Sequence, residues 1–170
     1  MKNMLIIPDP HASPDYDNER FSALGEFILS TKPQYIVCLG DMADMGSLSS
    51  YDKGTKGFEG RRYKKDISSV IDAQTKLFAP IKKYNASMRK HKKKSYKPKL
   101  HMCIGNHEDR IDRATNGSPE LYGTIGLSDL QYEKFGWKIT PFKRSLSIEG
   151  IVISHYFTSG IAGRPISSTH

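Results

Sequence analysis

The sequence predicts an α/β fold in which helices and strands are layered around a buried sheet, and two observations carry this prediction. Four short apolar runs, rich in β-branched or aromatic residues, stand between turn-forming residues at 4–8, 35–39, 100–104 and 151–154. Continuous apolar character over about five residues is typical of strands that are buried on both faces. Apolar residues at helical spacing lie between the first two runs, which indicates a strand–helix–strand unit.

Two helices are expected. Residues 18–30 carry the first, because their apolar residues recur at helical spacing and Pro33 follows. A second is expected from about Arg62 to Met88, and Pro80 should kink or interrupt it, since proline removes a backbone donor and crowds the preceding turn. Residues 45–60, which precede this helix, are rich in Gly and Ser and are predicted to form a long loop.

The last part of the sequence is expected to be antiparallel. Short strands are predicted at 137–140, 145–148 and 151–154, with Glu149-Gly150 as a hairpin turn. A chain of 170 residues is long enough for one domain with a substantial core and too short for two, so we expect a single domain over residues 1–170.

Composition places the basic charge in one stretch. The formal net charge is +8, yet residues 73–107 contain ten Lys or Arg and no Asp or Glu, which leaves 16 basic and 18 acidic residues elsewhere. Such a stretch attracts phosphate-bearing partners through counterion release. Tyr63, Tyr84 and Tyr96 are interleaved with the basic residues of 61–65 and 82–99, which suits nucleic acid. A solvated helix end and loop is the equally weighted alternative.

No apolar run approaches the roughly 20 residues that a membrane span needs. The apolar residues of Met4–Ile7 are too few for the core of a signal peptide. Cys38 and Cys103 each lie inside an apolar run, where a buried free thiol is the usual state. We therefore expect no membrane partner and a cytoplasmic location.

Polar motifs follow each of the four apolar runs. The residues concerned are Asp9-Pro10-His11, Gly40-Asp41-Met42-Ala43-Asp44, Gly105-Asn106-His107-Glu108 and Ser154-His155. Ligands bind at the carboxyl ends of strands in open α/β sheets, so neighbouring strands would bring these groups into one crevice. Each motif alone is weak, because an Asp after Gly is more often a turn residue. All four together favour a functional site.

Asp, Asn and His side chains supply oxygen and imidazole ligands, which suit Mn, Fe, Zn or Mg better than soft metals. A carboxylate such as Asp41 can bridge two cations about 3.5–4 Å apart, an arrangement that activates water and clamps a phosphoryl group. His107 would then protonate the leaving oxygen.

These motifs, in this order, resemble those of the calcineurin-like metallophosphoesterase superfamily from residue 5 to about residue 155. The resemblance implies two divalent metal ions, of which Mn is the first expectation. It implies that Asp9 and His11 bind the first, that Asn106 and His155 bind the second, and that Asp41 bridges both. His107 resembles the catalytic histidine, and Asp44 the carboxylate that orients it.

The resemblance also implies a sandwich of two mixed sheets flanked by helices, and hydrolysis of phosphomonoesters or phosphodiesters by metal-activated hydroxide. The sequence departs from the family in its last motif, Gly-His-x-His, because His155 is followed only by residues up to Ser167-Ser168-Thr169-His170. His170 is read as outside that motif. We therefore expect an incomplete second sheet and a separate C-terminal fragment as partner.

A second departure concerns the substrate. Protein phosphatases of the superfamily continue the second motif as Asp-Arg-Gly, whereas Asp44 is followed by Met45-Gly46. Arg110 is the candidate to bind phosphate in place of that arginine, with a surface ion pair as its alternative role. The leading prediction is thus a metal-dependent phosphoesterase. One version of this hypothesis has nucleic acid as the substrate. The alternative is a nucleic-acid-binding module or split fragment with an incomplete, inactive metal site.

Overall fold

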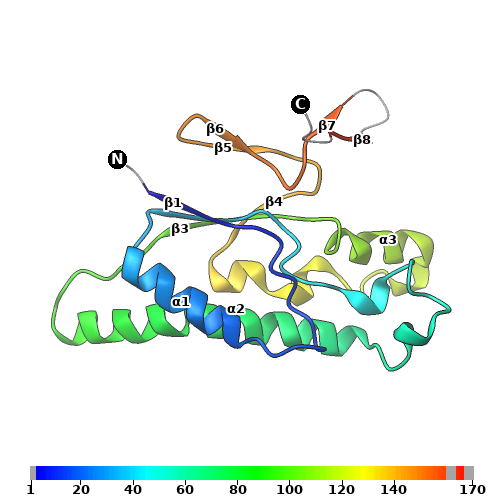
Figure 1. Ribbon diagram of the computed structural model, residues 1–170, viewed down its shortest axis with the longest axis horizontal. Helices are drawn as coiled ribbons and strands as arrows, with labels where there is room; N and C mark the ends of the chain where they lie inside the picture. The colour runs from blue at the N-terminus through cyan, green and yellow to red at the C-terminus, as the bar shows by residue number, and fades with distance from the viewer. Residues whose placement is uncertain (1–2, 160–163, 167–170) are drawn as a thin grey trace.

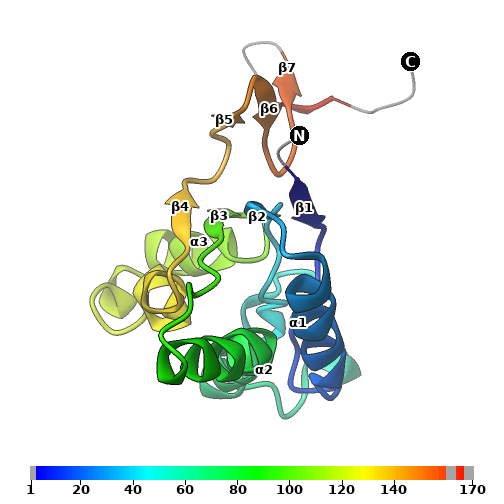
Figure 2. The same ribbon diagram turned by 90° about the vertical axis from the view of Figure 1, so that its left-hand side faces the viewer.

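The computed structural model describes residues 3–159 and 164–166 and has three layers. A four-stranded parallel sheet in the order β1-β2-β3-β4 forms the middle layer. Helices cover one face of this sheet, and a small antiparallel hairpin lies over the other (Figures 1 and 2). The predicted layered α/β fold is confirmed.

The parallel sheet consists of β1 (Met4–Ile7), β2 (Tyr35–Cys38), β3 (Lys99–Cys103) and β4 (Lys138–Thr140). In β2, Ile36 and Cys38 belong to the core on the helical face, while Tyr35 and Val37 belong to a second core against the hairpin. Every residue of β2 is buried. The continuous apolar run in the sequence therefore reflects a central strand that is covered on both faces.

The helical layer is made by α1 (Glu19–Thr31) and α2 (Tyr63–Lys90), which pack against one another. Both predicted helices are confirmed, but Pro80 does not interrupt α2, which runs unbroken through it. The absence of a side chain at Gly25 of α1 lets the two helices approach each other closely near Pro80. A Cβ on Gly25 would collide with the Leu77 carbonyl oxygen and lie 3.1 Å from the Pro80 ring.

The structure confirms one part of the predicted arrangement of the last strands and corrects two others. The predicted hairpin is confirmed, because β6 (Ile151–Ile153) pairs antiparallel with β5 (Leu146–Ile148) and Glu149-Gly150 form the turn between them. Residues 138–140, however, form β4, which pairs in parallel with β3 and does not join the antiparallel unit. The run at 151–154 is not buried on both faces either, since Ile151 and Val152 are exposed on the hairpin.

Short helices connect the strands and position the site. In the long loop lie the 3₁₀ turns η1 (Gly46–Leu48) and η2 (Lys56–Phe58). After β3 comes α3 (Asp109–Gly117), which the sequence analysis missed, followed by three 3₁₀ turns, η3 (Pro119–Leu121), η4 (Leu127–Leu130) and η5 (Tyr132–Phe135). These turns cover the helical side of β4 beside α2 (Figure 2).

The last described strands are β7 (Thr158–Ser159) and β8 (Arg164–Pro165), which pair antiparallel. The expectation about His170 lies outside the described residues. Cys38 and Cys103 are buried free thiols, as predicted. Among the described residues, no helix combines the length and the apolar character that crossing a bilayer would require.

The contact at Gly25 predicts the cost of a side chain there. Gly25→Ala should lower the free energy of unfolding by about 1–3 kcal/mol, because the backbone of α2 has to move to admit the methyl group. Gly117→Ala is the matched control, since nothing lies within 4 Å of a Cβ at that helix position. Urea unfolding of both variants tests this, and equal stabilities would contradict the close approach.

Candidate metal centre

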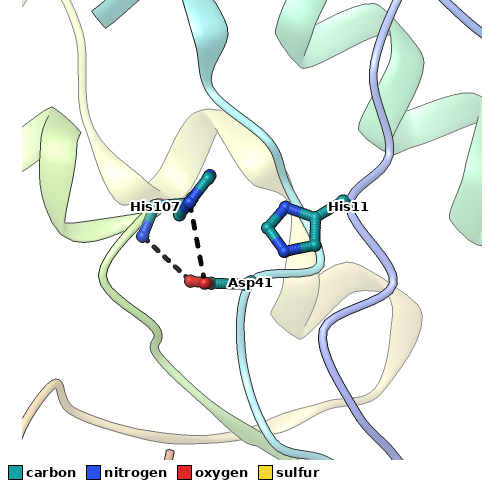
Figure 3. A group of neighbouring side chains, drawn as sticks. All are labelled: His11, Asp41 and His107. Atoms are coloured by element: carbon teal, nitrogen blue, oxygen red, sulfur yellow. Dashed lines mark hydrogen bonds and ion pairs between the residues drawn. The ribbon is translucent and has the colours of Figure 1, made fainter. Parts of the chain in front are cut away.

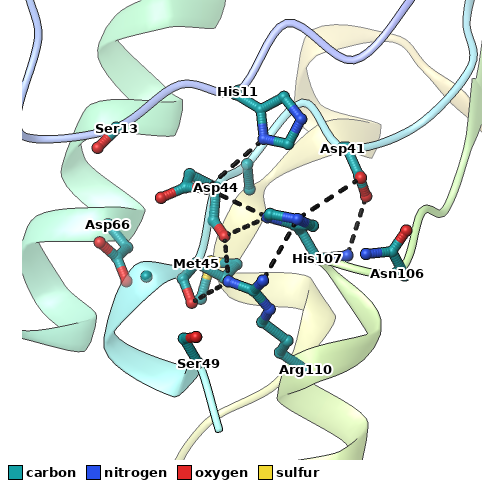
Figure 4. A network of polar contacts seen from close by, with 12 residues as sticks. His11, Ser13, Asp41, Asp44, Met45, Ser49, Asp66, Asn106, His107 and Arg110 are labelled. Carbon is teal, nitrogen blue, oxygen red and sulfur yellow. Dashed lines mark hydrogen bonds and ion pairs between the residues drawn. The ribbon is translucent and has the colours of Figure 1, made fainter. Parts of the chain in front are cut away.

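The site lies at the carboxyl ends of β1, β2 and β3, where three loops meet (Figure 4). Asp9 and His11 follow β1, Asp41 and Asp44 follow β2, and Asn106 and His107 follow β3. Because β2 lies between the other two strands, its loop contacts both neighbours. His155 reaches the same place from the hairpin layer, just after β6. The structure therefore brings together all seven predicted ligand and catalytic residues.

Backbone hydrogen bonds extend the pairing of the first two loops beyond the sheet. The His11 amide donates to the Asp41 carbonyl at 2.9 Å, and the Ala12 amide donates to the Met42 carbonyl at 2.7 Å. The Asp44 amide returns a bond to the Ala12 carbonyl at 3.0 Å. These bonds fix the spacing of the side chains on either side of the crevice.

Three of the predicted ligands have left-handed backbone conformations. The φ angles are 33° at Asp9, 46° at His11 and 49° at Asp41. Such conformations cost non-glycine residues roughly 1 kcal/mol or more each and persist where the surroundings enforce them, which is common at functional sites. The strain aims the three side chains into one crevice.

Two glycines allow the second and third loops to touch. A Cβ on Gly105 would overlap the Asp41 carboxylate and lie 2.5 Å from the Asp41 amide nitrogen. A Cβ on Gly40, whose φ is 116°, would lie 2.8 Å from the Gly105 amide nitrogen and 2.9 Å from the His155 ring. Both glycines of the sequence motifs are therefore explained by close packing of the ligand-bearing loops.

Glu108 holds these loops together and is the residue whose role the sequence analysis missed. Its side chain is fully buried and accepts the amides of Asp41 and Gly105 at 3.0 Å each and that of Ala43 at 3.1 Å. The Tyr132 hydroxyl donates a fourth bond at 2.8 Å. Burial raises the pKa of this carboxyl, and the amide and hydroxyl donors oppose that shift. The signal in the sequence was the carboxylate that ends the motif Gly105-Asn106-His107-Glu108.

Two groups of side chains could each hold a cation. The first contains His11, Asp41 and His107 (Figure 3). The second contains Asp9, Asp41 and His155. Within each group the ligand atoms lie within 4.8 Å of one another, and Asp41 belongs to both. Carboxylate oxygens and imidazole nitrogens form a donor set that fits Mn, Fe, Zn or Mg.

The grouping differs in two respects from the assignment that the resemblance implies, because His107, the catalytic candidate, belongs to the first group and Asp9 does not. Asp9 lies with His155, its Oδ1 3.8 Å from the His155 Nδ1, and not in the group of His11. Asn106 lies beside the second group, because its Oδ1 is 2.9 Å from the His155 Nε2. The Asp9 side chain is 53% exposed and Asp41 only 6% exposed, so Asp41 lies at the base of the crevice and Asp9 at its rim.

His107 is held on both ring edges. Its Nδ1 lies 2.7 Å from the Asp44 carbonyl oxygen and 3.2 Å from the Asp44 Oδ1, and its Nε2 lies 3.9 Å from the Asp41 Oδ2. Burial disfavours the charged ring, but the hydrogen bond to Asp44 and the charge of Asp41 outweigh it, so the His107 pKa is raised. The same hydrogen bond lowers the pKa of Asp44.

Arg110 lies inside this network and is not a surface ion-pair partner. Its guanidinium donates to the carbonyl oxygens of Asp44 at 2.9 Å and Met45 at 3.3 Å (Figure 4). Another guanidinium nitrogen lies 3.3 Å from the His107 Nε2. The guanidinium therefore brings a positive charge to the edge of the crevice, next to the catalytic candidate.

A cavity of about 310 Å³ lies beside Asp44, and the long loop forms one wall of it. Arg61 organises that wall: it donates to the carbonyls of Gly46 and Gly57 at 3.0 Å each and pairs with Asp52 at 3.0 Å. The sequence analysis placed Arg61 only in a basic segment, because its contacts depend on the folded loop. The cavity gives room for a substituent next to the ligand groups.

The contacts of Glu108 predict a large effect of a small change. Glu108→Gln should destabilise the protein by about 2–4 kcal/mol, because an amide nitrogen would face backbone donors that lose their acceptor. Tyr132→Phe removes one donor alone and should cost about 1 kcal/mol. Urea unfolding of the two variants measures the difference, and the account fails if Glu108→Gln is as stable as the parent or if the two losses are equal.

Comparison with known proteins agrees with the geometry. No curated protein sequence matches the chain closely enough to be called a relative. The family model described as calcineurin-like phosphoesterase matches residues 2–163. The match spans nearly the whole sequence and includes every loop of the candidate metal centre. The chain therefore belongs to the calcineurin-like phosphoesterase family.

Proposed function

We propose that this protein hydrolyses a phosphomonoester or phosphodiester with two divalent cations, Mn²⁺ first among them, held on either side of Asp41. Membership of the family supports a metal-dependent phosphoesterase in general. The observation that carries the dinuclear proposal is the presence of Asp41 in both groups of ligand side chains. A single buried carboxylate between two sets of His and Asp side chains has the arrangement of a bridging ligand.

Each residue would have a defined task. Cations in such a site neutralise phosphate charge and lower the pKa of a bound water. Asp41 would bridge them, with His11 on one side and with Asp9, His155 and Asn106 on the other. The backbone bonds to Glu108 fix Asp41 before any ligand arrives, so little reorganisation accompanies binding.

His107 would act as the proton donor to the leaving oxygen and not as a permanent ligand. Its Nδ1 is taken up by Asp44, and its Nε2 faces the crevice with the Arg110 guanidinium 3.3 Å away. A cation on that nitrogen would lie against the positive charge of Arg110, which Coulomb repulsion disfavours. Asp44 orients the ring and favours its protonated form, as a general acid requires.

Arg110 would bind the substrate phosphate from the edge of the crevice. A guanidinium can present two donors to a phosphate. One guanidinium nitrogen of Arg110 lies beside His107, next to the place where the ester bond would be cleaved. The leaving group would then extend toward the cavity beside Asp44. Action on nucleic acid would require the polymer to enter this crevice, whereas the basic stretch at 82–99 lies at the other edge of the sheet.

Activity measurements test the proposal. With Mn²⁺ present, the protein should hydrolyse p-nitrophenyl phosphate or its bis ester, and EDTA should abolish the reaction. Asp41→Asn should abolish it as well, because both ligand groups lose a charge. His107→Ala should slow it about 10²- to 10⁴-fold, the usual contribution of a general acid.

Two substitutions serve as matched controls. Asp112→Asn removes an exposed carboxylate from α3, and His91→Ala removes an exposed imidazole at the end of α2. Both should hydrolyse the esters at the parental rate. Hydrolysis that survives Asp41→Asn and His107→Ala together would overturn the proposal.

A further inference from the structure

A second concave surface lies at the amino ends of the parallel strands, away from the candidate metal centre at their carboxyl ends. It is a hollow of about 420 Å³ at the start of β2 and β3, and we call it the lysine pocket. Four lysines line it together with Tyr35 and Tyr96: Lys32, Lys94, Lys97 and Lys99. Three of the four come from the basic stretch that the sequence analysis singled out.

Positive charge predominates in this pocket. Among the described residues no ion pair joins a carboxylate to any of the four lysines, whereas Lys76 on α2 pairs with both Glu19 and Asp72. The Glu149 carboxylate lies next to the pocket, where it accepts a hydrogen bond from the Tyr35 hydroxyl at 2.7 Å. Lys32 donates to the Tyr84 hydroxyl at 2.9 Å and Lys99 to the Tyr35 hydroxyl at 3.3 Å, so both ammonium groups are anchored on neutral partners. Lys94 and Lys97 are exposed, and neither side chain has a hydrogen bond or an ion pair with the described residues.

The lysine pocket is separate from the metal centre. Lys99 begins β3, whereas the Gly105–His107 ligand loop follows the end of that strand. The four steps from Lys99 to Cys103 alone span about 13 Å. Figure 1 shows the loop between α2 and β3 at one end of the molecule and α3, which follows the ligand loop, at the other. Figure 2 views the molecule from the side of the lysine pocket.

We propose that the lysine pocket binds the phosphodiester backbone of a nucleic acid. Four ammonium groups around one hollow provide point charges for successive phosphates, and their release of counterions favours a polyanion. Tyr35 is buried and Tyr96 half-buried, their hydroxyls bonded to Glu149 and to the Pro33 carbonyl. The Tyr35 ring is buried with the Lys99 ammonium nitrogen 5.0 Å from its centroid, so the lysines are the groups through which the pocket would recognise the backbone, independently of base sequence.

A lipid surface fits the pocket less well. Peripheral membrane binding combines basic residues with apolar side chains that enter the bilayer. Between Tyr51 and Tyr122, a span that includes the whole basic stretch, no large hydrophobic side chain is exposed among the described residues. The basic stretch that supplies three of the four lysines therefore carries no apolar anchor of its own, which favours a hydrophilic polyanion.

This binding does not depend on the proposed hydrolysis. A polymer held at the lysine pocket lies at the other edge of the sheet from the ligand groups, so it can be bound without being cut. Small esters do not reach across the sheet and should be hydrolysed equally well whether or not the pocket is intact. The two proposals can therefore fail separately.

The test is binding of a fluorescently labelled 20-nucleotide single strand, measured by anisotropy between 50 and 300 mM NaCl. Lys94→Ala with Lys97→Ala should weaken binding about tenfold near 100 mM salt and reduce the slope of log K against log salt by about 1.4, for two lost phosphate contacts. Both side chains are exposed and have no hydrogen bond or ion pair with the described residues, so the fold should persist, and an unchanged urea midpoint would confirm this.

The matched control is the pair Lys64→Ala and Lys134→Ala, which removes the same charge from exposed positions outside the pocket. Parental affinity in the control together with weak binding in the pocket variant supports the proposal. Equal losses in both would show an effect of net charge alone and overturn it. Stronger binding to vesicles rich in phosphatidylglycerol than to the strand would also overturn it, in favour of a membrane.

Hydrolysis of bis-p-nitrophenyl phosphate by the pocket variant separates this proposal from the proposed function. Unchanged hydrolysis with weakened strand binding supports two separate sites. Loss of both together would show that the pocket variant disturbs the metal centre, which contradicts a separate site. A parent protein that binds the strand but hydrolyses no ester would leave the lysine pocket supported and the proposed function refuted.

Discussion

The buried carboxylate of Glu108 is the interaction on which the metal centre depends. It gathers the amides of Asp41, Ala43 and Gly105, which belong to two different loops, around one negative charge. Without it, three backbone donors would be buried with no acceptor, at a cost of about 1–3 kcal/mol each. The bridging candidate is thus positioned by its own backbone, and the side chain of Asp41 remains available to ligands.

The rest of the fold serves to bring loops to that carboxylate. The parallel order of β1, β2 and β3 delivers three ligand-bearing loops to one edge, and glycines at 40 and 105 let two of them touch. The hairpin layer adds His155 from above the sheet, with its Nδ1 2.9 Å from the Leu39 carbonyl oxygen. The amino ends of β2 and β3 carry the lysines, so the sheet separates the candidate metal centre from the proposed anion-binding pocket.

The sequence predicted the strands and helices that have strong patterns and the residues that follow strand ends. It predicted the hairpin that precedes His155, but it assigned residues 137–140 to the same antiparallel unit, because so short a run does not show which strand it will pair with. α3 was missed because its sequence is mostly polar and buries only Ile111. The contacts that hold Glu108 and Arg110 against the loop after β2 cross 65 or more residues of sequence, which no local pattern records.

Calorimetric titration of the purified protein with Mn²⁺ tests the central claim most directly. The account predicts two sites for the parent and for His107→Ala, since His107 is assigned to proton transfer. It predicts that Asp41→Asn weakens both sites at once, because a single carboxylate serves both ligand groups. One site in the parent, or an Asp41→Asn variant that keeps one site at full affinity, would contradict the shared carboxylate.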